Sequence, residues 1–203
     1  YEKDKNGKDI LLRHGYKQVM MQWEKPYMEK SIDKLNPNGD VLEIGFGMGY
    51  SASQIQKYKP KSYTIVEMDD LVIKKIKKWK KKFNNVIIVK GKWQDKLKDL
   101  KKYDQIYFDD YPLDLKDKND KKEIKKNKNR FYYFLNKILL FHTNPGARIS
   151  LYFPSSNTTK FKNRILKHPL VKDYKEYSIH VNIPDNCNYH YDNHLKIPII
   201  YRK

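Results

Sequence analysis

Three glycines at the end of an apolar run are the residues of this sequence best suited to hold a ligand. Gly45, Gly47 and Gly49 follow residues 41–44 and alternate with larger residues. Because glycine has no Cβ, it lets a strand turn sharply and lets the backbone approach a ligand closely. A ligand is therefore expected against this turn, although an ordinary tight turn between a strand and a helix uses the same residue type.

The spacing of the glycines indicates which ligand. In the dinucleotide fingerprint G-x-G-x-x-G the third glycine would stand at position 50, which is Tyr50, whereas here it comes one residue earlier, at Gly49. Glu43 precedes the first glycine by two residues. Acidic-x-G-x-G-x-G is the pattern of class I methyltransferases, whose cofactor carries a sulfonium and an amino-acid end and no phosphate. We therefore expect S-adenosylmethionine as cofactor and S-adenosylhomocysteine as its product.

Two later loops support an adenosyl ligand. Glu67 ends the apolar run 63–67, 20 residues after Gly47, where a carboxylate would bind two ribose hydroxyls. The alternative for Glu67 is a helix-capping or surface acid. After a third apolar run comes Trp93, which would lie against an adenine or else be a plain core residue. Loops at the carboxyl ends of three successive strands fit one ligand at the switch point of an open sheet.

Two acids end the fourth apolar run, beside the expected position of the methyl group. Asp109 and Asp110 are followed there by Tyr111, Pro112 and Leu113. Methyltransferases that act on nucleic-acid bases place Asp/Asn-Pro-Pro-aromatic at this point to hold a flipped base. An acidic residue stands here where the first proline belongs, which argues against a base as the methyl acceptor.

Several stretches of the chain resemble one known family. They are residues 19–28, 41–48 and 108–113, with shorter pieces at 90–93, 144–146 and 185–189. In this order they resemble the guanidinoacetate N-methyltransferase family, whose relatives include arginine methyltransferases. The resemblance runs from about residue 16 to the C-terminus. Its Trp-Glu-x-Pro-Tyr-Met and Asp-x-Tyr-Pro-Leu pieces are far more specific than the glycine loop.

The resemblance implies which residues contact the ligands. For the cofactor they are Met20, Met28, Glu43, Gly45, Phe46, Gly47, Met48, Gly49, Tyr50, Glu67, Met68, Asp69, Lys92, Trp93 and Asp109. For the methyl acceptor they are Glu24 and Asp109, which hold the guanidino group, together with Tyr111, Ser155 and Ser156. The chain departs from the family pattern at Met68 and Asp69, which replace a Cys-Asn pair, and at Asp110, which replaces a threonine.

The two implied acids suit a guanidino acceptor. A guanidinium has a pKa above about 12 and a delocalised lone pair, so it is a poor nucleophile. Glu24 and Asp109 would neutralise its charge, hold its plane and aim one nitrogen at the methyl carbon, and Asp109 would accept the proton released on attack. The ordinary alternatives are that Glu24 caps or pairs on a helix and that Met20 and Met28 are core residues.

The charge of the chain leaves other acceptors open. Its formal net charge is +19 over 203 residues, and basic proteins often bind nucleic acid. The positive charge is almost all lysine, however, and lysine accompanies abundant Asn, Ile and Tyr, whose codons are all A/T-rich, so a biased genome accounts for the composition. The lysine runs also fall where a helix shows a solvated face. The rival functions are an RNA or protein methyltransferase that docks through lysines, and a catalytically silent S-adenosylmethionine-binding protein.

Other residue types exclude several classes of protein. Cys187, His190 and His194 have a ligand-like spacing for zinc, but a fourth ligand is not obvious, and no metal is expected. A single cysteine excludes an internal disulfide and suits a reducing cytosol. No apolar run approaches the roughly 18 residues of a membrane helix. The first residues lack the apolar stretch of a signal peptide, so no membrane partner is expected.

The elements that must position these residues alternate along the chain. Strands are expected at 41–45, 63–67, 86–89, 105–109 and 148–153, and helices near 50–58, 69–82, 94–101 and 121–141. Segments 176–183 and 196–201 lack an intervening helix, which predicts an antiparallel hairpin at the sheet edge. The predicted fold class is therefore α/β, a Rossmann-like, doubly wound, seven-stranded and mostly parallel sheet.

The N-terminal segment is expected to differ from the rest. Residues 9–36 read as helical, with Pro26 bending or splitting the segment. Residues 1–36 would then form a helical cap that contributes to the substrate site. We expect one domain over residues 1–203, because no linker or repeat divides the chain.

Overall fold

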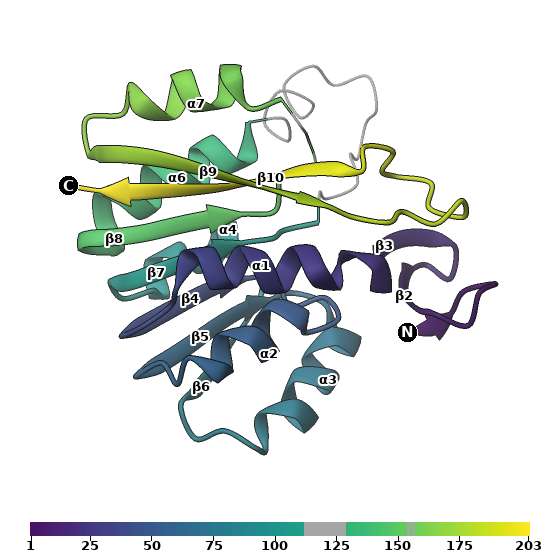
Figure 1. Ribbon diagram of the computed structural model, residues 1–203. Coiled ribbons are helices and arrows are strands. Elements are labelled where there is room, and N and C mark those ends of the chain that lie inside the picture. Colours follow the sequence, from purple (N-terminus) through teal and green to yellow (C-terminus); the bar gives the residue numbers. More distant parts are fainter. Residues whose placement is uncertain (112–128, 154, 156) are drawn as a thin grey trace, which may run out of the picture.

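A seven-stranded sheet forms the centre of the molecule in the computed structural model, which describes residues 1–111, 129–153, 155 and 157–203 (Figure 1). Its strands lie in the order β6-β5-β4-β7-β8-β10-β9. Their bounds are β4 Asp40–Ile44, β5 Ser62–Glu67, β6 Val86–Lys90, β7 Tyr103–Phe108, β8 Thr143–Leu151, β9 Val171–His180 and β10 His194–Arg202. Neighbouring strands in the run β6-β5-β4-β7-β8 are parallel, whereas β10 is antiparallel to both β8 and β9. The predicted Rossmann-like sheet and its terminal antiparallel hairpin are confirmed.

Helices cover both faces of this sheet. On one face lie α1 Lys25–Leu35, α2 Tyr50–Lys57 and α3 Asp70–Lys80, and on the other lie α4 Trp93–Lys96, α6 Arg130–Phe141 and α7 Thr159–Leu166. Alternate side chains of a strand point to opposite faces, so Val41 packs in the first layer and Leu42 in the second. Each face of the sheet is therefore covered by a hydrophobic cluster. Because both faces are buried, the strand sequences are nearly continuous apolar runs.

The N-terminal segment is mostly strand, so the helix expected over residues 9–36 is wrong for its first half. Strands β1 Glu2–Lys3, β2 Asp9–Arg13 and β3 Lys17–Met21 form a small antiparallel sheet. The β2–β3 turn has positive φ at both His14 (56°) and Gly15 (78°), a conformation that suits a hairpin and stops a helix. The 3-10 helix η1, Gln22–Glu24, then leads into α1, where Pro26 lies in the first turn and does not bend the helix.

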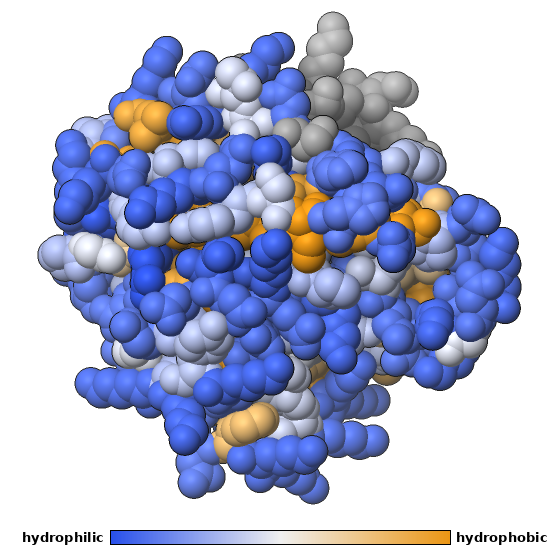
Figure 2. Space-filling model, viewed as in Figure 1, coloured by the Kyte–Doolittle hydropathy of each residue, from blue (hydrophilic) through white to orange (hydrophobic). Residues whose placement is uncertain are grey.

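Smaller differences concern the helices. The segment 94–101 contains the short α4 and the 3-10 helix η2, Leu97–Asp99, and α7 was not expected at all. Of the helix expected near 121–141, the structure describes α6, and residues 112–128 lie outside the described residues. No helix in the described ranges is long and apolar enough to cross a bilayer. Figure 2 shows hydrophilic side chains over most of the viewed face, in keeping with the high net charge.

Candidate active site

The glycine loop joins the end of β4 to the start of α2. Gly45, Gly47 and Gly49 have φ values of 81°, 50° and 80°, which disfavour any residue with a Cβ. A Cβ on Gly45 would collide with the Asp109 carbonyl oxygen, and one on Gly47 would lie 2.7 Å from Met20 Sδ. The loop therefore packs closely between the end of β7 and the N-terminal hairpin, and the approach of a ligand to its glycines stays a prediction.

Glu67 ends β5 beside this loop. Its carboxylate accepts hydrogen bonds from the backbone N–H groups of Phe46 (3.1 Å), Met68 (2.7 Å) and Asp69 (2.9 Å). Burial raises the pKa of Glu67, and these three donors oppose that rise. The Asp69 carboxylate instead caps α3 by accepting from the backbone N–H groups of Leu71 and Val72. Glu67 is thus a held, buried acid at the loop and not a helix cap.

Glu43 lies beneath the loop and not on its surface. The residue is fully buried, and the Tyr63 hydroxyl donates a hydrogen bond to its carboxylate. It points to the same face of the sheet as Val41, under α1 and α2. Burial raises the pKa of Glu43 to about 8.

Trp93 is part of the core on the other face. It is 5% exposed and packs edge-on against Phe108 and Phe134. Its Nε1 donates to Asp110 Oδ2 (2.9 Å), and Asp110 Oδ1 accepts from Arg130 Nε (2.7 Å). The structure therefore favours the core interpretation of Trp93, and it explains the acid that stands in place of the family's threonine. Lys92, directly before it, is exposed.

Two acids that are distant in sequence meet at the carboxyl end of the sheet. Glu24, on η1, is 3% exposed, and its Oε1 accepts from Met21 N–H (2.9 Å) and from the Tyr189 hydroxyl (2.5 Å). Burial raises the pKa of Glu24 to about 7. The pKa of Asp109, directly after β7, is raised well above its ordinary value, first by burial and then by the charge of Glu24. The charges of Glu24 and Asp109 also both raise the pKa of Tyr152, so the two carboxyls lie within electrostatic reach of each other.

Two methionines of the N-terminal segment make contacts with the glycine loop and with β7. Met20 and Met28 are both buried. Met48 N–H donates to Met20 Sδ (3.3 Å), and the Tyr107 hydroxyl donates to Met28 Sδ (3.0 Å). Their burial agrees with the alternative that they are core residues. The Met20 sulfur nevertheless lies at the glycine loop and the Met28 sulfur at β7.

The remaining expected substrate residues lie around the same edge. Tyr111 is partly buried, with Arg13 and Lys17 of the β2–β3 hairpin 6.0 and 5.7 Å from its ring centre. Ser155 Oγ donates to the Asn157 carbonyl (3.4 Å). Ser156 lies outside the described residues. The hairpin, and not a helix, is therefore the part of the cap that faces Tyr111.

Three tyrosines at the candidate site were not among the predicted site residues. The Tyr1 hydroxyl donates to the Gly47 carbonyl (2.6 Å), and Tyr189 donates to Glu24. The Tyr152 hydroxyl is buried near Glu24 without a hydrogen-bond partner among the described residues. Tyr1 and Tyr152 carry no local signal, and only the motif at residues 185–189 drew attention to Tyr189.

The zinc-like spacing does not form a cluster. Cys187 is buried against Ile10 and Met21, His190 stacks on Trp23 (5.5 Å), and His194 lies beside His180. No three side chains of His, Cys, Asp or Glu in the described ranges gather as metal ligands.

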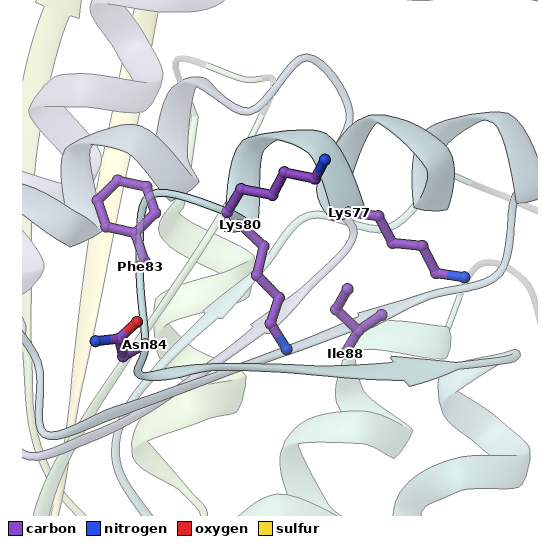
Figure 3. Close-up of a pocket in the computed structure, with 6 residues that line it drawn as sticks. Lys77, Lys80, Phe83, Asn84 and Ile88 are labelled. Carbon is purple, nitrogen blue, oxygen red and sulfur yellow. The ribbon is translucent and has the colours of Figure 1, made fainter.

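A surface hollow occurs away from the acids. It is lined by Lys77, Lys80, Lys81, Phe83, Asn84 and Ile88, between the end of α3 and the edge strand β6 (Figure 3). The glycine loop lies at the carboxyl ends of the strands, whereas Asn84 precedes the amino end of β6. This hollow is therefore separate from the candidate active site.

The fold and the site define a class of protein. A doubly wound sheet with an acidic-x-G-x-G-x-G turn after its first central strand and an acid at the end of the next is that of the class I S-adenosylmethionine-dependent methyltransferases. Solved structures agree on the fold. An O-methyltransferase from Bacillus cereus in complex with S-adenosylhomocysteine has a TM-score of 0.60 at 14% identity, over 91% of this chain and 82% of that chain. TrmN from Thermus thermophilus has a TM-score of 0.64 at 10% identity, over 91% and 50%.

Sequence relatives narrow the class to a family. The guanidinoacetate N-methyltransferase family model matches residues 2–138, and the chain belongs to that family. It is 30% identical to protein arginine N-methyltransferase 2 of Saccharomyces cerevisiae over 208 residues, 90% of this chain and 48% of that protein. It is 41% identical to the Candida glabrata protein of the same name over 109 residues, 50% of this chain and 26% of that protein. The matches thus span about half or less of these curated relatives.

Proposed function

We propose that this chain transfers a methyl group from S-adenosylmethionine to a nitrogen of a guanidino group. One observation supports this most strongly: Glu24 is 3% exposed, Asp109 is partly buried, and the charge of Glu24 adds to burial in raising the pKa of Asp109. No lysine, arginine or histidine of the described residues forms an ion pair with either acid. Paired buried acids are costly unless a cation joins them, and a planar guanidinium offers five donors to such a pair.

The residues around the glycine loop suit the cofactor. The loop presents backbone with no Cβ, and Glu67 keeps lone pairs beyond its three backbone donors for ribose hydroxyls. The Tyr50 hydroxyl, at the start of α2, is buried without a partner among the described residues and is available to a ligand. Met20 and Met28 would contact the cofactor from the cap side. When bound, S-adenosylmethionine supplies an electrophilic methyl group on its sulfonium.

The acids would then prepare the acceptor. A guanidinium is held flat and neutralised when two carboxylates each accept hydrogen bonds from it, which aligns one nitrogen for in-line attack. Such positioning lowers the activation free energy of methyl transfer by roughly several kcal/mol. A carboxyl with a raised pKa is also a better proton acceptor than an ordinary one. Asp109 would take the proton that the attacking nitrogen loses, while Glu24 fixes the far side of the group.

The acceptor is tested with a panel of guanidines. Free arginine, guanidinoacetate, agmatine and arginine-containing peptides are incubated with labelled cofactor, and the products are weighed by mass spectrometry. We expect at least one member to gain 14 Da per transfer, a mass fixed by replacing H with CH3. Methylation of none of them, with S-adenosylhomocysteine still bound, would support the silent binding protein instead.

A second candidate function is docking of an RNA or protein acceptor through lysines. The observation that favours it is the hollow of Figure 3, which three lysines line together with the apolar side chains of Phe83 and Ile88. Micromolar, salt-sensitive RNA binding together with RNA methylation would support it.

A further inference from the structure

The motif at residues 185–189 has no role in the proposed function, although it lies against one of the two acids. It belongs to the loop that joins β9 to β10, and this loop rests on the N-terminal hairpin. Gln18 Nε2 donates to the Asn186 carbonyl (2.7 Å), and Asn188 N–H donates to Gln18 Oε1 (2.9 Å). Cys187 packs in the same contact, buried against Ile10. One glutamine side chain thus fixes the backbone on both sides of Cys187.

This fixed loop places one phenol on Glu24. The Tyr189 ring lies 6.3 Å from the Trp23 ring, and its hydroxyl donates to Glu24 Oε1, the oxygen that also accepts from Met21 N–H. A buried carboxylate is stable only when donors replace the water that it has lost. The two donors therefore hold one oxygen of Glu24 in a defined place.

We propose that Tyr189 is a positioning residue for the guanidino site, delivered by the β9–β10 loop to fix the Glu24 carboxylate and to favour its charged form. The inference rests on the proposed function, since it assigns Glu24 to the acceptor. Tyr189 keeps its own proton, because burial and the Glu24 charge raise the pKa of its hydroxyl above the ordinary value. It is therefore a donor across the working pH range.

The other groups around Glu24 do not replace Tyr189. They are Tyr27 on α1, Tyr50 on α2, Asp109 after β7, Tyr152 after β8, and His190 stacked on Trp23. The charge of Glu24 raises the pKa of Asp109, and the buried Tyr152 hydroxyl has no hydrogen-bond partner among the described residues. Burial already raises the pKa of Glu24 to about 7, so losing a donor shifts its charge at neutral pH.

The test compares Tyr189→Phe with wild type and with Tyr103→Phe, a buried tyrosine at the opposite end of β7. Removing one hydrogen bond to a carboxylate should raise the pKa of Glu24 by about one unit, which lowers the ratio of its charged to its neutral form about tenfold and its charged fraction at pH 7 about fivefold. In Tyr189→Phe we expect the KM for the best guanidine to rise about fivefold at pH 7 and to return to the wild-type value near pH 9. The affinity for S-adenosylhomocysteine should stay within about twofold. A purely structural defect would not be rescued by pH.

A second measurement does not depend on turnover. Carboxyl-¹³C glutamate NMR, with the Glu24 signal assigned by its loss in Glu24→Gln, follows the titration of Glu24 directly. An upward shift in Tyr189→Phe and none in Tyr103→Phe supports the proposal, even if no guanidine is methylated and the proposed function fails. An unchanged Glu24 titration in Tyr189→Phe overturns it, even if guanidines are methylated. Should Tyr189→Phe not fold, Gln18→Ala must show the same upward shift, since it releases the loop.

Discussion

The carbonyl oxygen of Asp109 occupies the space that a Cβ on Gly45 would need. The Asp109 N–H also donates to the carbonyl of Ile44, the residue before Gly45 (2.9 Å). These contacts exist because β4 and β7 are parallel neighbours, with Ile44 opposite Phe108. The first glycine of the loop proposed to hold the cofactor is therefore packed against the proposed acceptor acid, and a substitution at either residue is expected to displace the other.

Gly45→Ala tests this unit. The residue would be strained by its φ of 81° and would also push on Asp109, so we expect a loss of at least about 2 kcal/mol of unfolding free energy and a tenfold or greater loss of S-adenosylhomocysteine affinity. Gly146→Ala is the matched control, since its φ is 78° but no atom lies within 4 Å of its added Cβ. Urea unfolding and calorimetry measure both. Equal losses in the two variants would show that strain, and not contact with Asp109, matters.

Asp109→Asn separates chemistry from cofactor binding. The amide cannot accept the proton and cannot neutralise a guanidinium, so methyl transfer should fall at least about 100-fold. Affinity for S-adenosylhomocysteine should stay within a few-fold, because the fold around the glycine loop is kept. Asp99→Asn, on the exposed end of η2, is the control and should behave as wild type. Wild-type turnover in Asp109→Asn would refute the proposed role.

Glu24→Gln should stabilise the ligand-free protein at high pH. Because the pKa of Glu24 is raised to about 7 in the folded state, the folded protein binds the extra proton between the ordinary value of about 4.5 and pH 7. Stability is thus lost as pH rises through this window, and the cost is fully present above pH 7. Glutamine avoids it, so the variant should gain roughly 1–3 kcal/mol at pH 8 and nothing at pH 5. Urea titrations at both values measure this, with exposed Glu2→Gln as control. A gain of the same size at pH 5 would contradict the assignment.

Trp93→Phe distinguishes a core tryptophan from an adenine contact. Since Trp93 is 5% exposed and donates to Asp110, the change should cost about 1–3 kcal/mol of stability and leave S-adenosylhomocysteine affinity within a few-fold. Trp79→Phe, which loses a comparable bond to Ser53 on the other face, is the control for indole loss. A drop in affinity of more than tenfold for Trp93→Phe alone would restore the adenine role.

Much of the fold was readable because it is encoded locally. The apolar runs predicted the bounds of β4, β5, β6 and β7 to within two residues, and the glycine spacing predicted the turn after Ile44. The N-terminal hairpin was missed, although His14 and Gly15 stand at its turn, because its apolar residues also fit a helical pattern. Helix α7 was missed because its apolar face is only Phe161 and Ile165.

The sequence by itself predicted the alternation of strands and helices in the main sheet, and it named the glycine loop and the two acids as candidate site residues, since periodicity, glycine spacing and short motifs are properties of neighbouring residues. Only the tertiary structure decided that Glu24 lies within electrostatic reach of Asp109, that the Tyr189 hydroxyl donates to Glu24 from 165 positions away, and that Trp93 lies in the core. The physical reason is that burial, which sets both the pKa values and the partners of these groups, arises from packing between distant segments and leaves no local pattern in the chain.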